Sequence, residues 1–107
     1  MKDYLSVVRS RAVEILVNPS NNRKWGGIKD SLDLTEELNP VDMRNKLEEL
    51  AEKIEDYFNL KNVTKIEGLR DYQIEPYKFL AQINFAIAEL SGVTFRQQLM
   101  DHSKYLN

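Results

Sequence analysis

The sequence predicts an all-α fold: a small antiparallel helical bundle of three to four main helices plus short helical turns. Two stretches carry this prediction. In residues 74–92 apolar side chains recur around most of a helical circumference, and in residues 40–58 they recur at spacings of four and three. The connections are short, which favours antiparallel neighbours. Residues 1–107 are therefore expected to form a single helical domain.

The first helix is expected over residues 3–17, where apolar positions recur three and four apart. It should end before Pro19, because a residue that precedes proline is pushed out of the helical conformation. Residues 18–27 are rich in Asn, Ser, Pro and Gly and are predicted to form a loop that carries the lone Trp25. One or two short helical turns are expected in residues 28–38.

The second main helix has the clearest start signals. Asn39 suits the capping position, Pro40 suits the first helical position, and Asp42 favours the positive end of the helix dipole. The helix is predicted to reach about Phe58, with oppositely charged residues four apart on its outer face. Its apolar stripe consists of Met43, Leu47, Leu50, Ile54 and Tyr57.

Residues 59–72 form a connection in which apolar residues three apart predict a turn or two of helix packed on the core. The central helix follows. We expect it to begin near Pro76 and to end at Gly92 with a left-handed cap. Other elements are expected to cover most of its circumference. A capping box at Thr94 predicts a separate last helix that reaches about Leu106.

The composition is typical of a globular protein, with 42% hydrophobic and 30% charged residues. The net charge of −2 supplies no overall field that would recruit nucleic acid or an anionic membrane. The chain has no cysteine, which excludes disulfides, thiolate metal sites and a cysteine nucleophile. Its N-terminal residues are not expected to act as a secretory signal, because arginines interrupt their apolar run, and no apolar stretch reaches about 20 residues. The expected location is therefore the cytoplasm, with no membrane contact.

Large aromatic residues and a basic loop are the candidate partner-binding residues. The stripe of the second main helix runs on to Tyr57 and Phe58, and Trp25 adds a further aromatic, which predicts more apolar surface than four helices can hide. The alternative is that all of this surface is core. A stripe of this spacing with charged flanks is also how antiparallel helical dimers are built. Arg23 and Lys24 precede the tryptophan, and with Arg9, Arg11 and Lys29 they make the N-terminal third of the chain basic. The second functional hypothesis is therefore a nucleic-acid-associated protein, with a phosphate-contacting patch in this third and Trp25 as the stacking aromatic.

The sole histidine, His102, follows Arg96 with five residues between them. This spacing resembles the Arg-x(4–6)-His signature of HEPN ribonucleases over seven residues. The resemblance implies that Arg96 positions phosphate and that His102 acts at a ribose 2′-hydroxyl. The residue after the arginine is Gln97, where that family has asparagine or another small polar group. Six positions along a straight helix also set the two side chains about 120° apart.

The acidic residues of the second main helix are interleaved with lysine and lie opposite the apolar stripe, which predicts a solvated face and no metal site. No di-iron or EF-hand pattern is present. We therefore expect a non-catalytic accessory, adaptor or inhibitor protein, without cofactor, that contacts another protein or a second copy of itself. The acidic residues are Glu48, Glu49, Glu52, Glu55 and Asp56.

Overall fold

The computed structural model describes the backbone of residues 3–106 and the side chains of residues 3–92. Over residues 3–106 the chain forms α-helices and one 3₁₀ turn, and no strand. The predicted all-α fold is therefore confirmed. In chain order the elements are α1 (Tyr4–Val17), α2 (Asn21–Trp25), η1 (Lys29–Leu32), α3 (Pro40–Tyr57) and α4 (Asp71–Leu106).

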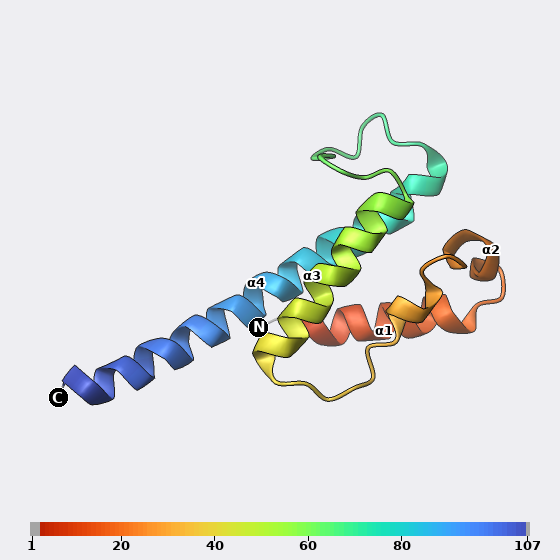
Figure 1. Ribbon diagram of the computed structural model, residues 1–107. Helices are drawn as coiled ribbons and strands as arrows, with labels where there is room; N and C mark the ends of the chain where they lie inside the picture. Colours follow the sequence, from red (N-terminus) through yellow and green to blue (C-terminus); the bar gives the residue numbers. More distant parts are fainter. Residues whose placement is uncertain (1–2, 107) are drawn as a thin grey trace.

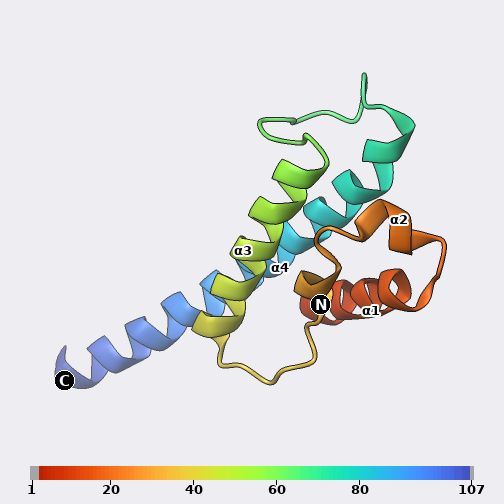
Figure 2. The ribbon, with the colours of Figure 1, turned by 45° about the vertical axis from the view of Figure 1, so that its right-hand side comes forward.

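Helix α4 is the axis of the fold, because α1 and α3 both pack on its N-terminal half (Figures 1 and 2). α3 runs antiparallel to α4 (Figure 1). α1 runs antiparallel as well: the Tyr4 N–H donates to Glu89 Oε2 at 3.2 Å, and further along Arg11 pairs with Glu75. η1 packs on α1. The ammonium group of Lys53, on α3, donates a hydrogen bond to the Ser31 hydroxyl of η1 at 3.1 Å. The short turn therefore joins α1 to α3.

Helix α1 has the predicted bounds. The Asp3 carboxylate accepts hydrogen bonds from the Ser6 N–H at 3.2 Å and from the Ser6 hydroxyl at 2.8 Å, and so caps the first turn. The next element corrects the predicted loop, because residues 21–25 are helical. Asparagine has weak helix propensity, but Trp25 at the end of this turn is packed into the core, and tertiary packing stabilises short helices that propensity does not.

Helix α3 also begins as predicted. The Asn39 Oδ1 accepts a hydrogen bond from the Asp42 N–H at 2.8 Å. At the other end Asn59 adopts a left-handed φ of 57°, and the Leu60 N–H donates to the Glu55 carbonyl at 2.8 Å. This is the Schellman arrangement, in which an asparagine or glycine ends a helix and satisfies a terminal carbonyl.

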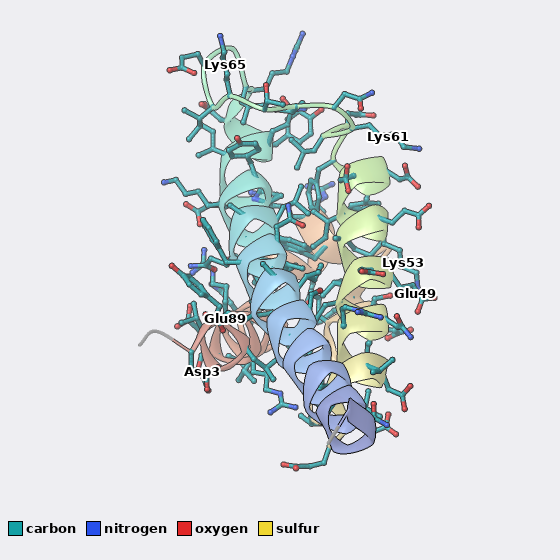
Figure 3. The ribbon with its side chains drawn as sticks, turned by 90° about the vertical axis from the view of Figure 1, so that its left-hand side faces the viewer. Asp3, Glu49, Lys53, Lys61, Lys65 and Glu89 are labelled. Carbon is teal, nitrogen blue, oxygen red and sulfur yellow. The ribbon has the colours of Figure 1, made fainter. Side chains whose placement is uncertain are left out.

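The connection after α3 lacks the helical turns predicted from its apolar spacing. Asn62 and Gly68 have left-handed φ values of 65° and 85°, which interrupt any helix. Leu60 is buried, but Ile66 is 43% exposed, so the three-residue spacing does not mark one packed face. Figure 3 shows Lys65 on this loop, beyond the ends of α3 and α4.

Helix α4 begins at Asp71, earlier than predicted, because the buried Gln73 side chain organises the junction. Its Oε1 accepts from the Arg70 N–H at 3.0 Å, and its amide nitrogen donates to the carbonyls of Phe58 at 3.0 Å and Asn59 at 3.1 Å. One side chain thus ties the end of α3 to the start of α4.

The predicted end at Gly92 is wrong, and so is the separate last helix that was to start at Thr94. α4 passes through Gly92, whose φ is not left-handed, and continues to Leu106. A glycine inside a helix costs about 1 kcal/mol relative to alanine, and helix-forming residues follow it. No helix within the described residues combines the length and apolar character needed to cross a membrane.

The second half of α4 projects beyond α1 and α3 (Figure 1). The helix has 36 residues, about 54 Å at 1.5 Å per residue, and it sets the 56 Å long axis of the molecule. The radius of gyration is 16.0 Å, larger than the roughly 13 Å of a compact chain of this length.

The core lies on one side of α4 only. The side that faces α1 and α3 is buried, whereas Asn84, Phe85 and Ala88 on the far side are exposed. The expectation that neighbours cover most of this helix is therefore wrong for the far side. The buried positions of α4 are Gln73, Pro76, Phe79, Leu80, Ile83 and Ala86.

Candidate functional site

Two of the five residues proposed for partner contact lie in the core. Trp25 is 3% exposed and Phe58 is 2% exposed. The rings of Trp25 and Phe58 meet edge to face, with centroids 4.7 Å apart, and Phe79 of α4 adds a second edge contact to the tryptophan at 6.0 Å. Neither Trp25 nor Phe58 therefore presents surface to a partner. The sequence predicted more aromatic surface than the helices could hide, but the rings at these two positions belong to the core.

Tyr57 keeps part of its ring at the surface, with 39% exposure. Its hydroxyl accepts a hydrogen bond from the Gly27 N–H at 3.3 Å, and the ring stacks edge to face on Phe58 with centroids 5.0 Å apart. A Cβ at Gly27 would lie 2.6 Å from the tyrosine ring, so only glycine allows this approach. Tyr57 therefore fastens the segment after α2 to the end of α3.

The basic N-terminal third is largely occupied by internal contacts. Arg9 donates to the carbonyls of Leu34 and Glu36, and Arg11 pairs with Glu14 and Glu75. Arg23 is exposed and Lys24 half-buried, and neither has an ion pair among the described side chains. With Trp25 buried, Arg23 and Lys24 have no stacking tryptophan beside them. Nucleic-acid binding here stays a prediction from the sequence.

A shallow cleft of about 240 Å³ opens beside these cations, where α1, α2 and α4 meet. Arg11 and Lys24 line it together with Glu14 and Glu75, so its fixed charges balance. Arg11 pairs with both carboxylates and Lys24 offsets the remaining negative charge, so the cleft has no net charge that would attract a charged ligand.

The acidic side of α3 faces solvent, as predicted. Figure 3 shows Glu49 and Lys53 pointing outward from it. Lys61 lies 3.4 Å from Asp56, an ordinary surface pair, whereas the enclosed Nε of the half-buried Arg44 lies 4.0 Å from Glu48, too far for a hydrogen bond. Within the described residues no three His, Asp or Glu side chains gather as metal ligands would.

Among the described side chains, the carboxyl groups of Asp3 and Asp33 have a clearly lowered pKa, and local hydrogen bonds explain both. The hydroxyl of Ser6, and then its N–H, lower the pKa of Asp3 below its ordinary value of 3.8. The hydroxyl and N–H of Thr35 do the same for Asp33, with the hydroxyl 2.7 Å from the carboxylate. Both groups stabilise chain turns at the surface.

The sequence alone did not identify an apolar stripe on the far side of α4, which we call the outer face: Ala81, Phe85, Ala88 and Gly92. These residues are spaced four, three and four apart. Phe85 is 54% exposed, Ala88 and Gly92 are exposed, and Ala81 is half-buried. The ring of Tyr4 stacks on one side of Phe85, with centroids 4.9 Å apart. Apolar character on this side was visible in the sequence, but its exposure depends on where α1 and α3 pack.

Arg96 and His102, the pair that resembles the HEPN signature, lie outside the residues whose side chains the structure describes. The ribonuclease alternative therefore stays a prediction from the sequence. The chain matches no protein-family model, no curated protein and no solved structure.

Proposed function

We propose that this chain is a non-catalytic interaction protein that works by contact with another protein, and that the outer face of α4 is the contact surface. The observation that carries the proposal is the exposure of Phe85 in the middle of the central helix. A helix that holds the core on one side normally carries polar residues on the other. Here the other side carries, beside the polar Asn84, an aromatic ring between Ala81 and Ala88.

The outer face differs from the other exposed apolar residues of the chain. Val17 on α1, for example, is 71% exposed, but single apolar residues at a surface are common and need no partner. The outer face is a stripe of residues spaced four, three and four apart on one helix, and the second half of that helix projects beyond the body (Figure 1). Contiguous apolar patches are typical of interaction sites.

The apolar stripe of α3, the first candidate for such contact, is already used within the chain. Met43, Leu47, Leu50 and Ile54 are at most 2% exposed and belong to the hydrophobic core, and α3 packs mainly on α4. A partner would have to open the core to reach them. We therefore assign the proposed docking role to α4 and not to α3.

Site-specific photo-crosslinking tests the proposal. A photoreactive phenylalanine analogue replaces Phe85 in one variant and Val17, an exposed apolar residue on α1, in a matched control. In the native host the Phe85 probe should give a discrete protein adduct that the Val17 probe does not, and Ala88→Glu should remove it. No adduct, or the same adducts from both positions, would refute a docking role for this face.

A further inference from the structure

The outer face continues as a regular repeat into the projecting half of α4. Along one helical backbone the positions 81, 85, 88, 92, 95, 99, 102 and 106 are spaced alternately four and three apart. At about 100° per residue all eight fall within an arc of about 100°. An apolar repeat that averages 3.5 residues is what a coiled-coil seam requires. The residues at these positions are Ala81, Phe85, Ala88, Gly92, Phe95, Leu99, His102 and Leu106.

We propose that this seam pairs with the same seam of a second copy of the chain, in antiparallel orientation, about a two-fold axis between residues 93 and 94. The proposal rests on the proposed function, since it uses the same face, and it names the partner. Because the seam is self-complementary in this register, the contact closes on itself and leaves no surface for further copies.

Size complementarity favours this register. It sets Ala81 against Leu106 of the second copy, Ala88 against Leu99, and Gly92 against Phe95, so that three of the four distinct layers join a small residue to a large one. The fourth joins Phe85 to His102, two rings. Dense packing of this kind is what stable interfaces share with protein interiors.

The parallel alternative packs badly. In it each seam residue faces its own copy, so Gly92 meets Gly92 and Ala88 meets Ala88, which leaves voids. Phe85 and Phe95 would then each meet an identical ring in a single layer. Voids and overfilled layers both destabilise a packed seam.

The lengths of the two halves also match. The outer face within the body spans residues 81–92, about 18 Å, and the projecting part spans residues 93–106, about 21 Å. In the antiparallel pair the projecting half of each copy lies along the exposed outer face of the other. The feature that makes the molecule elongated would then cover the surface that its own core leaves open.

Charges beside the seam agree with the same orientation. Glu89 and Arg96 occupy equivalent positions next to it, seven residues apart. In the antiparallel register Glu89 of one copy lies within about 3 Å, measured along the axis, of the level of Arg96 of the other, and the pair occurs twice. The Tyr4 N–H donates to the Glu89 carboxylate at 3.2 Å and holds it at this edge, where Figure 3 shows it beside the start of α1. A parallel pair would set Glu89 against Asn84 and Arg96 against Ser91.

Engineered cysteines test the register, because the natural chain has none. In the antiparallel pair Ala88→Cys combined with Leu99→Cys places a thiol of each copy against a thiol of the other. The two positions lie about 16 Å apart along one helix, too far for a disulfide within a chain. Two controls are Ala88→Cys alone and Ala88→Cys with Gln97→Cys, in which the second thiol occupies the side of α4 away from the seam.

Under mild oxidation of the purified chain, the Ala88→Cys/Leu99→Cys variant should run as a covalent dimer, while both controls stay largely monomeric under the same conditions. Efficient crosslinking of Ala88→Cys alone would show a parallel pair and overturn the register. If no variant crosslinks and light scattering gives the wild-type chain the 12.5 kDa of a monomer at micromolar concentration, self-association is refuted. In that case a Phe85 photo-adduct with a different protein would still uphold the proposed function, and its absence would end both.

Discussion

Ile83 and Phe85 lie two residues apart on α4 but on opposite sides, which allows the two faces of the helix to be compared directly. Ile83 is fully buried between α4 and its neighbours, whereas Phe85 is 54% exposed. We predict that Ile83→Ala lowers the free energy of unfolding by about 2–5 kcal/mol, because it removes buried methyl groups and leaves a cavity. Phe85→Ala removes a larger side chain but should cost less.

The cost at Phe85 follows from its surroundings. Complete burial of a phenylalanine is worth about 1.5–3 kcal/mol, and roughly half of this ring is buried, which gives about 1 kcal/mol. The stacked Tyr4 ring adds about 0.5–1.5 kcal/mol, and no closed cavity is left on the open side. We therefore expect a loss of about 1.5–2.5 kcal/mol within one chain.

Urea denaturation followed by far-UV circular dichroism measures both losses. The denaturation curves should be recorded at the lowest workable protein concentration, because association with a second copy then adds least to the apparent stability. An equal cost for the two variants, or a cost below about 0.5 kcal/mol for Ile83→Ala, would contradict the assignment of one side of α4 to the core.

Three further predictions concern side chains whose hydrogen bonds hold the helix ends and turns. Gln73→Leu should lower the free energy of unfolding by about 2–4 kcal/mol, because three backbone groups at the α3–α4 junction lose their partner; a neutral effect in urea denaturation would contradict the bonds described. Asn39→Ala should cost about 1 kcal/mol by loss of the α3 cap, while Asn39→Asp retains it; equal midpoints for the two variants would refute the cap. The pKa of Asp33 is lowered in the folded state. The ionised Asp33 carboxylate therefore contributes its full share to folding stability above the unfolded pKa of about 3.8, and this stability is lost as the pH falls through the lowered pKa. In Asp33→Asn the melting temperature should therefore fall less when the pH is lowered below about 4. If the melting temperatures of the variant and the wild type fall equally with pH, Asp33 does not contribute in this way.

Much of the helical framework could be predicted because its signals are local. The cap at Asn39 and the stop before Pro19 act within a few residues, so sequence alone locates these ends. The true start of α4 could not be predicted this way. It depends on Gln73 reaching the carbonyls of Phe58 and Asn59, two residues that lie close to it only in the folded chain.

The candidate surface was harder to predict for the same reason. Trp25 has the sequence context of an exposed loop residue, but it contacts Phe58 and Phe79 once α2 forms. Phe85 belongs to a helix that is apolar on nearly every side, so its sequence suggests a buried residue. Only the packing of α1 and α3 on one side of α4 reveals that the opposite side is left uncovered.

The central claim, that α4 holds the core with one side and a second copy with the other, is tested most directly by sedimentation equilibrium of the wild-type chain beside Ala88→Glu. We predict that the wild type has twice the 12.5 kDa mass of one chain and that Ala88→Glu has the monomer mass with unchanged helix content. A wild-type mass of 12.5 kDa at every concentration, or an Ala88→Glu variant that still dimerises, would contradict it.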